Sequence, residues 1–306
     1  MSRILLLGKN GQVGWELQRS LAILGEVVAL DVDSAPPWRA DFLDTGSLAA
    51  LVRAVAPTLI VNAAAHTAVD KAESEPDLVF AINAAAVGTL AREAAALGAW
   101  LVHYSTDYVF DGSGSVPWQE DDPTAPLSVY GRSKADGEAL IRASGCRHLI
   151  FRTSWVYGAR GENFAKTMLR LAATRDALNV IDDQIGAPTG AELLADVTAQ
   201  AWRMAAERAE LSGTYHAVAA GATSWHGYAR HVIAFAKARG IALRVSPDDI
   251  HAIDSASYPQ AAQRPKNSRL ATDKLQHAFG LRLPPWQDGV DRMLTETLAA
   301  TGPQTA

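Results

Sequence analysis

The sequence predicts an α/β protein built on a doubly wound parallel sheet, followed by a smaller C-terminal α/β lobe. Three observations support this. Over residues 1–155, continuous apolar runs alternate with amphipathic ones, which is typical of parallel strands covered by helices on both faces. Three glycines follow the first apolar run, and an acidic residue follows the second. Beyond about residue 155 the alternation weakens, which indicates a second structural unit.

The individual elements follow from the same patterns. Five apolar runs predict strands at residues 4–7, 27–30, 59–62, 100–105 and 149–153. Amphipathic runs predict helices at residues 13–24, 45–55, 77–97 and 129–144. In the second half we expect helices at 163–173, 190–208, 224–238 and 286–299, and strands at 177–181 and 213–217.

Two segments predict irregular structure. The stretch 239–269 is rich in Pro, Ser and Ala, and the final "TGPQTA" predicts a frayed tail. We therefore expect one domain over residues 1–155 with parts of 190–220, and a second lobe over 156–189 and 221–306.

Composition narrows the class of protein. The 306 residues are 48% hydrophobic and 20% charged, as in ordinary globular proteins. A net charge of −5 and a pI near 5.9 argue against nucleic acid as a partner. The single cysteine, Cys146, cannot form an internal disulfide, which fits a reducing compartment. The N-terminus shows no signal-peptide pattern, and no apolar run reaches the roughly 20 residues that span a membrane. We expect a cytoplasmic protein without a membrane partner.

The glycine-rich segment "RILLLGKNGQVGWEL" predicts a dinucleotide-binding loop. Gly8, Gly11 and Gly14 are spaced G-x-x-G-x-x-G, which differs from the common G-x-G-x-x-G, but they lie between a strand and a helix as that loop does. A helix N-terminus there attracts phosphate. Asp31, after the second strand, suits an adenosine ribose. The alternative is a tight turn that binds nothing.

A second constellation favours a catalytic site. Tyr130 and Lys134 in "YGRSK" are one turn apart on one face of a predicted helix. The strand "LVHYSTD" ends in Ser105, Thr106 and Asp107, at the edge where parallel sheets bind ligands. A tyrosine with an ordinary pKa near 10 transfers protons poorly at neutral pH, so we expect the Lys134 ammonium to lower the pKa of Tyr130. The alternative is an ordinary surface pair.

These segments resemble a known family. "GKNGQVGWEL", "VNAAAHTAVDKAESEP", "HYSTDYVFDG", "PLSVYGRSK", "FRTSWVYG", "DDQIGAPTG" and "RPKNSRL", in this order over residues 8–270, are similar to the dTDP-4-dehydrorhamnose reductases of the extended short-chain dehydrogenase/reductase superfamily. The resemblance implies a Rossmann-like fold and an oxidoreductase. Its expected reaction is the NADPH- or NADH-dependent reduction of the 4-keto group of dTDP-4-dehydro-β-L-rhamnose. That reaction completes dTDP-L-rhamnose biosynthesis for lipopolysaccharide O-antigen and other cell wall polysaccharides.

The resemblance also implies roles for individual residues. Tyr130 would give a proton to the keto oxygen, Lys134 would hold the nicotinamide ribose, and Thr106 would bind the carbonyl or Tyr130. The expected cofactor-binding residues are Gly8, Gly11, Gln12, Val13 and Gly14 at the pyrophosphate, Asp31 at the ribose, Asp41 and Phe42 at the adenine, Ala63, Ala64, Ala65, His66 and Thr67 near the nicotinamide, and Tyr130 and Lys134.

The sugar nucleotide would meet a separate set of side chains. The expected substrate-binding residues are Thr106, Asp107, Trp155, Arg264, Lys266 and Asn267. Cationic side chains suit a diphosphate, and an aromatic face suits a sugar or base. The structural alternatives are a turn cap for Asp107, a packed indole for Trp155 and a solvated loop for the last three.

The expectations of a Mg²⁺ site and of a homodimer rest on the resemblance alone. Glu16 and Glu192 match positions that some members associate with Mg²⁺ at a homodimer interface, and both also suit solvated helix carboxylates. His66 and His103 belong to no ligand cluster, and we interpret them as structural or cofactor-adjacent.

Three questions stay open at the level of sequence. A related epimerase or dehydratase would use the same loop and the same Tyr-x-x-x-Lys pair, and a regulatory subunit could retain both. Asp31 favours NADH, whereas Lys9 could accommodate the 2′-phosphate of NADPH.

Overall fold

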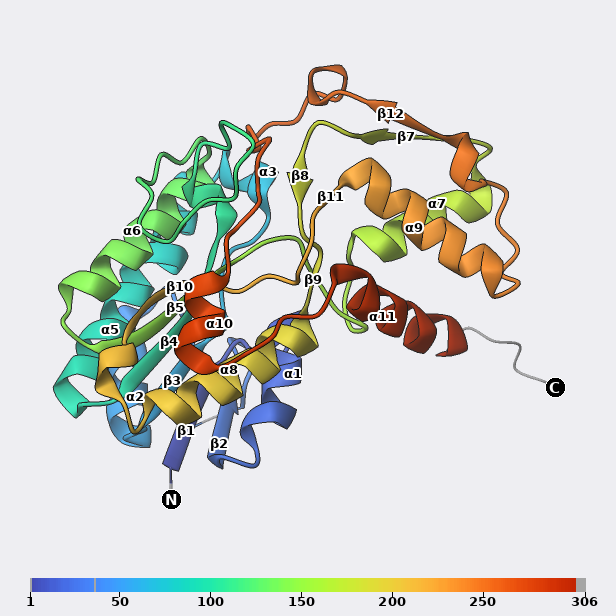
Figure 1. Ribbon diagram of the computed structural model, residues 1–306. Coiled ribbons are helices and arrows are strands. Elements are labelled where there is room, and N and C mark those ends of the chain that lie inside the picture. Colours follow the sequence, from blue (N-terminus) through green and yellow to red (C-terminus); the bar gives the residue numbers. More distant parts are fainter. Residues whose placement is uncertain (1, 36, 301–306) are drawn as a thin grey trace.

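The computed structural model describes residues 2–35 and 37–300, and a six-stranded parallel sheet forms its centre (Figure 1). The strand order is β10-β5-β4-β3-β1-β2, and every neighbouring pair is parallel. The strands are β1 (Ser2–Leu7), β2 (Gly25–Leu30), β3 (Leu59–Asn62), β4 (Trp100–Thr106), β5 (Arg147–Thr153) and β10 (Gly213–His216). The predicted doubly wound α/β fold is therefore confirmed.

Helices cover both faces of this sheet. One face packs against α2 (Thr45–Val55), α5 (Ala86–Leu97) and α6 (Val129–Ala143). The other packs against α1 (Gln12–Leu21), α8 (Ala191–Ala205) and α10 (Asp273–Phe279). Within β1, Ile4 and Leu6 enter the second core and Leu5 and Leu7 the first, because successive side chains point to opposite faces. Burial on both faces explains why the strands are continuously apolar.

The first crossover fixes where a ligand can bind. The chain runs from β1 to β2 on one side, then returns to β3 on the other side of β1. In open α/β sheets this reversal leaves a crevice at the carboxyl ends of the strands. The end of β1 and the ends of β3, β4 and β5 face that crevice.

The helix predicted at 77–97 is interrupted. It consists of α4 (Pro76–Phe80), a π-helical turn η1 (Ala81–Ala85) and α5. By length and composition alone the run Pro76–Leu97 could cross a membrane, contrary to our expectation that no segment would, but 61% of its most apolar window is buried inside the protein. It is apolar because it packs between the sheet and α6.

A smaller lobe lies beside the sheet and has its own apolar core (Figure 1). It contains α7 (Phe164–Thr174), α9 (Trp225–Ala238) and α11 (Trp286–Ala300), with β7 (Leu178–Ile181) paired in parallel to β12 (Ile250–Ile253). Two short pairs connect it to the sheet: β6 (Val156–Tyr157) with β9 (Thr189–Gly190), and β8 (Ile185–Gly186) with β11 (Thr223–Ser224).

Most predicted elements are confirmed to within a few residues, and the differences concern short ones. The helices predicted at 13–24 and 190–208 end earlier, at Leu21 and Ala205. The stretch expected to be irregular contains β12, and α3 (Val69–Ala72) and α10 were not predicted. The remaining short elements are the 3-10 turns η2 (Asp107–Val109), η3 (Ala209–Leu211), η4 (Pro247–Asp249) and η5 (Ser255–Ser257). The predicted frayed tail lies outside the described residues.

Candidate active site

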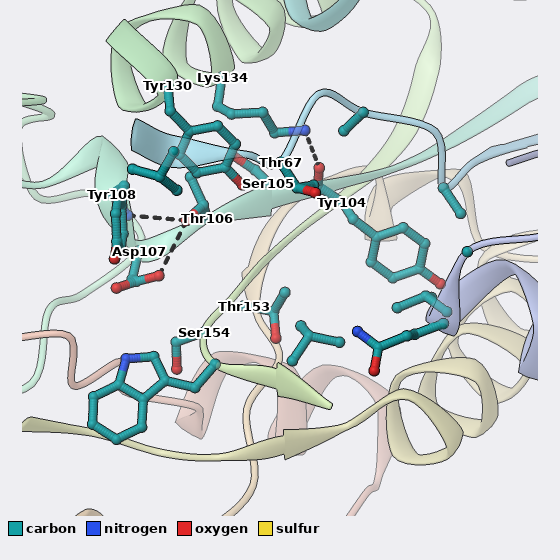
Figure 2. Close-up of a pocket in the computed structure, with 18 of the residues that line it drawn as sticks. Thr67, Tyr104, Ser105, Thr106, Asp107, Tyr108, Tyr130, Lys134, Thr153 and Ser154 are labelled. Carbon is teal, nitrogen blue, oxygen red and sulfur yellow. Dashed lines mark hydrogen bonds between the residues drawn. The ribbon is translucent and has the colours of Figure 1, made fainter. Parts of the chain in front are cut away.

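A cleft of about 460 Å³ opens at the carboxyl ends of the strands, between the sheet and the smaller lobe (Figure 2). It brings together many of the predicted site residues from segments far apart in the sequence. Those lining it are Gly11, Gln12, Val13, Ala63, Ala65, Thr67, Thr106, Asp107, Tyr130, Lys134 and Trp155. Ser105, noted from the sequence at the same strand end, also lines it, whereas the sequence did not identify the lining residues Tyr104, Tyr108, Thr153, Ser154 and Trp225.

The glycine loop forms one wall of the cleft. Gly8 has a φ of +84°, and a Cβ there would lie 2.6 Å from the Ala64 amide nitrogen. A Cβ on Gly14 would overlap the Gly8 carbonyl oxygen. Gly11 begins α1 without a side-chain cap, and the buried Oε1 of Gln12 has no hydrogen-bond partner. The loop therefore leads into a helix N-terminus that has no side-chain cap, which suits a phosphate-bearing ligand.

Asp31 connects this loop to the end of β2. Its carboxylate accepts hydrogen bonds from the backbone amides of Asn10, at 3.1 Å, and Val32, at 2.8 Å. Farther along the same edge, Asp41 lies 3.6 Å from Arg39, whereas the Phe42 ring is buried in the core beside α2. A contact with adenine remains a prediction for both residues, and burial leaves little of the Phe42 side chain available for it.

Helix α6 supplies the central pair of the site. Ser128 caps the helix by accepting a hydrogen bond from the Gly131 amide at 3.1 Å. Tyr130 and Lys134 both project into the cleft (Figure 2). Thr106, at the end of β4, lines the cleft beside Tyr130 (Figure 2). The fold thus places a phenol and a strand-end hydroxyl next to each other in the same cleft.

Electrostatics at this pair differ from our expectation. Burial raises the pKa of Tyr130 to about 12, although the Thr106 hydrogen bond opposes the shift. The expected lowering by Lys134 is absent, because the Lys134 Nζ bonds the Tyr104 carbonyl oxygen at 2.5 Å and lies 3.2 Å from His103 Nε2. Burial also lowers the pKa of Lys134 to about 8. The phenol is consequently held in its protonated form.

Asp107 follows Thr106 and is buried. Burial raises the pKa of its carboxyl group to about 7, against hydrogen bonds from Ser268 and Thr106. The Thr106 hydroxyl donates to Asp107 Oδ1 at 3.1 Å, and Thr106 Oγ1 accepts from the Tyr108 amide at 3.2 Å. The side chain that caps the turn η2 is therefore that of Thr106, whereas Asp107 lines the cleft, and its contact with substrate stays a prediction.

Two stacked tryptophans line the opposite wall. Trp155 adopts a φ of +49°, and its ring stacks on Trp225 with centroids 3.6 Å apart and planes 13° from parallel. Trp225 donates to Gln184 Oε1 at 3.2 Å. No local pattern identifies Trp225 as a site residue, because it begins a helix and its partner ring is seventy residues away in the chain. Both indoles line the cleft.

The three substrate-binding residues predicted in "RPKNSRL" have different surroundings in the structure. Arg264 donates to both carboxylate oxygens of Asp70, at 3.1 and 2.7 Å, and Lys266 lies 2.9 Å from Asp183. Asn267 is buried, and its amide donates to the carbonyls of Val116 at 2.8 Å and Ser113 at 3.3 Å. The prediction that the Asn267 side chain binds substrate does not fit this arrangement, because both amide protons are used to hold the 113–116 loop.

His66 and His103 lie behind the cleft walls. Asn83, in the π-helical turn, holds the backbone of His66 through hydrogen bonds of 2.9 and 3.1 Å. His103 is fully buried within β4. Their interpretation as structural or cofactor-adjacent residues agrees with these positions.

Glu16 and Glu192 lie close enough to influence one another. Burial, together with the Glu16 charge, raises the pKa of Glu192. Over residues 2–35 and 37–300, no group of three or more His, Cys, Asp and Glu side chains is arranged to hold a metal ion.

Comparison with known proteins agrees with the geometry of the cleft. Residues 1–299 match the family model described as the RmlD substrate binding domain. A dTDP-4-dehydrorhamnose reductase of Salmonella typhimurium is 56% identical over 298 residues, covering 97% of this chain and 99% of the relative.

Two solved structures share the whole fold. The reductase from Clostridium acetobutylicum superposes with a TM-score of 0.86 at 34% identity, covering 96% of this chain and 98% of the other. The reductase from Bacillus anthracis, solved in complex with NADP, has a TM-score of 0.83 at 32% identity, with coverages of 97% and 99%. The chain belongs to the dTDP-4-dehydrorhamnose reductase family.

Proposed function

We propose that this protein reduces the 4-keto group of dTDP-4-dehydro-β-L-rhamnose to dTDP-β-L-rhamnose with NADPH or NADH. The observation that carries the proposal is that Thr106, Tyr130 and Lys134 line one cleft together with the glycine loop. A relative that is 56% identical over 298 residues bears the name of this activity. The reaction would complete dTDP-L-rhamnose synthesis.

The cleft fits a dinucleotide cofactor. Gly8 and Gly14 allow the loop to fold tightly against Ala63 and Ala64, and the uncapped start of α1 suits the pyrophosphate. Asp31, at the end of β2, would face the adenosine ribose. When bound, the nicotinamide supplies the hydride that reduces the keto carbon. Ala63, Ala65 and Thr67 line the cleft near Lys134 and would contact that end of the cofactor.

Tyr130 would deliver the proton to the keto oxygen. Its raised pKa keeps the phenol protonated at neutral pH, which is the form that a reduction requires. Thr106, in the same cleft, would bind the keto oxygen or the Tyr130 hydroxyl. A charged Lys134 near the phenol would stabilise the phenolate as the proton leaves.

The smaller lobe would bind the sugar nucleotide. Trp155 and Trp225 offer flat faces to a sugar or base at the cleft, and Asp107 offers a hydrogen-bonding carboxyl group. A neighbouring hollow of about 600 Å³ lies between α7 and β7 and shares Trp225 with the cleft. Arg264 also lines it, so the diphosphate would lie near this guanidinium and Lys266.

We further propose the following organisation. Residues 1–155 with parts of 190–220 form the cofactor domain, and 156–189 with 221–306 form the substrate lobe. The protein acts in the cytoplasm as a homodimer, and its single buried cysteine suits reducing conditions. Glu16 and Glu192 would hold Mg²⁺ together with water molecules, and no catalytic step depends on this ion.

The proposal is tested with Tyr130→Phe. Removing the proton donor should lower kcat by about 10²- to 10⁴-fold while NADPH affinity stays within about twofold. The matched control is Tyr108→Phe, because the Tyr108 ring lies edge-on to Tyr130 at 5.7 Å and should not donate the proton. Substrate-dependent oxidation of NADPH, followed by absorbance, measures both.

Stoichiometry separates reduction from the related reactions. A reductase releases one oxidised cofactor per sugar nucleotide converted, whereas an epimerase or dehydratase regenerates its cofactor. Absence of net oxidation with the 4-keto sugar nucleotide would overturn the proposal.

A further inference from the structure

Two buried polar side chains lie directly behind Lys134. The Lys134 Nζ is 3.2 Å from His103 Nε2, and His103 Nδ1 is 3.1 Å from Asn62 Nδ2. Asn62 and His103 face each other on β3 and β4, and both are almost completely buried. Neither lines the cleft, so neither can touch a ligand there.

The backbone fixes the direction of this chain of hydrogen bonds. Asn62 Oδ1 accepts from the Ala64 amide at 3.1 Å, so the amide group of Asn62 turns its NH₂ towards His103. That NH₂ donates to Nδ1. A neutral imidazole that accepts at one nitrogen carries its proton on the other. The proton of His103 therefore lies on Nε2 and points at Lys134.

An N–H directed at Lys134 Nζ favours one form of the amine. An ammonium group has only donors, whereas a neutral amine has a lone pair that accepts the N–H while its own hydrogens reach the Tyr104 carbonyl. His103 does not relieve this by ionising, because burial lowers the pKa of its ring well below the usual value.

We propose that Asn62 and His103 are positioning residues that fix Lys134 and favour its uncharged form in the free cleft. The lysine then acquires its charge when ligands fill the site and supply partners for an ammonium group. The proposal rests on the proposed function only in assigning Lys134 to the reductase site.

The charged groups around Lys134 agree with this. Glu138, one turn further along α6, favours the charged lysine, but its carboxylate is paired with Arg152 at 2.8 Å and Arg142 at 3.0 Å. Tyr130 and Asp107 line the same cleft, and burial favours the neutral form of each. Burial lowers the pKa of Lys134 to about 8, which moves the amine toward its uncharged form, in the same direction as the His103 hydrogen bond.

The first test reads the proton directly and needs no substrate. Protein labelled with ¹⁵N-histidine is observed by long-range ¹H–¹⁵N correlation NMR, and the His103 signals are assigned by their loss in His103→Leu. We expect a neutral ring with the proton on Nε2 across neutral pH. A proton on Nδ1, or an imidazolium, would overturn the proposal whether or not the protein is a reductase.

The second test reverses the hydrogen bond. In Asn62→Asp the new carboxylate accepts from Nδ1–H, so Nε2 becomes an acceptor and favours the ammonium. The pKa of Lys134, measured from the pH dependence of its labelling by acetic anhydride, should rise by about one unit. The alkaline limb of kcat/KM should move in the same direction.

A control distinguishes positioning from simple charge. The same Asn62→Asp substitution is made in a His103→Leu background, where the hydrogen-bond chain is broken. We expect the shift in the pKa of Lys134 to fall by at least half. An undiminished shift would mean that the carboxylate acts on Lys134 through space, and the relay through His103 would be wrong.

Discussion

Asp107 is a carboxyl group buried at the end of β4, in the wall of the cleft. Burial raises its pKa to about 7, so the folded protein binds this proton more tightly than the unfolded chain does. The group therefore weakens the fold as pH rises from its ordinary pKa of 3.8 towards 7, and by a constant amount above 7. A role of Asp107 in substrate binding would explain why the protein keeps this carboxyl group buried although it lowers the stability of the fold at neutral pH.

Asp107→Asn tests this account. The amide cannot ionise, so the variant should gain stability relative to the parent as pH rises from about 4 to about 7, by about 4 kcal/mol over the window. Urea unfolding at pH values spanning this window measures the difference. The control is Asp111→Asn: hydrogen bonds from Ser113 lower the pKa of Asp111, so the sign should reverse. A difference in the free energy of unfolding between Asp107→Asn and the parent that does not change with pH would contradict the raised pKa of Asp107.

At the scale of elements, the junction of β1 and α1 depends on which glycines have room for a side chain. Gly14 packs directly on the Gly8 carbonyl, whereas a Cβ at Gly11 would lie 3.4 Å from the same oxygen, with the backbone already in an ordinary conformation. The two positions belong to one motif but have different steric requirements.

Gly14→Ala should therefore destabilise the ligand-free protein by about 2 kcal/mol, because the strand and helix must separate to admit the methyl group. Gly11→Ala, its matched control, should stay within about 0.5 kcal/mol of the parent. Chemical denaturation without cofactor measures both. Equal destabilisation by the two substitutions would show that the close contact is not what requires glycine.

The elements also show what could be predicted from sequence. The strand at 59–62 was predicted because it is buried on both faces and so reads as an unbroken apolar run. By contrast, β12 contains two exposed residues among four and depends on its pairing with β7, which no local pattern reveals. Short strands of this kind are stabilised by distant neighbours.

The site residues fall into the same two groups: those that a local sequence pattern predicts and those that only long-range contacts reveal. Tyr130 and Lys134 could be predicted because their spacing on one helix is local. The Trp225 stack on Trp155 and the capture of the Asn267 amide by a loop 150 residues earlier are long-range contacts, so only the fold reveals them. The same holds for the pKa of Tyr130, which depends on burial rather than on its neighbour in sequence.

At the scale of the whole molecule, an ion pair joins the two sides of the cleft. Asp70 in α3 accepts two hydrogen bonds from Arg264 and one from the Ala262 amide at 3.1 Å, and these come from the segment that follows β12. Arg264 lowers the pKa of Asp70 through this contact, so the pair loses its contribution only as pH falls into the acid range. The contact sets how the 262–264 segment lies over the site.

Asp70→Asn should loosen that segment. Because Asp70 is about half exposed, we expect a loss of no more than about 1 kcal/mol in stability. The KM for the sugar nucleotide should rise about fivefold, since Arg264 is no longer held in place, while the KM for NADPH should remain near the parent value. Steady-state kinetics with each substrate varied in turn measures this.

The matched control is Glu26→Gln, which breaks the exposed Arg3–Glu26 pair at 3.1 Å, remote from the cleft. It should leave both KM values unchanged. If Asp70→Asn also leaves them unchanged, the ion pair joins the two sides without influencing substrate binding.

The stacked indoles of Trp155 and Trp225 have an optical consequence. Two aromatic chromophores with centroids 3.6 Å apart couple their electronic transitions, so the free protein should show an exciton couplet in its circular dichroism. A sugar or base that enters the cleft and separates the rings would abolish that couplet. The protein thus contains an intrinsic spectroscopic reporter of substrate entry, which can be followed in real time without any label.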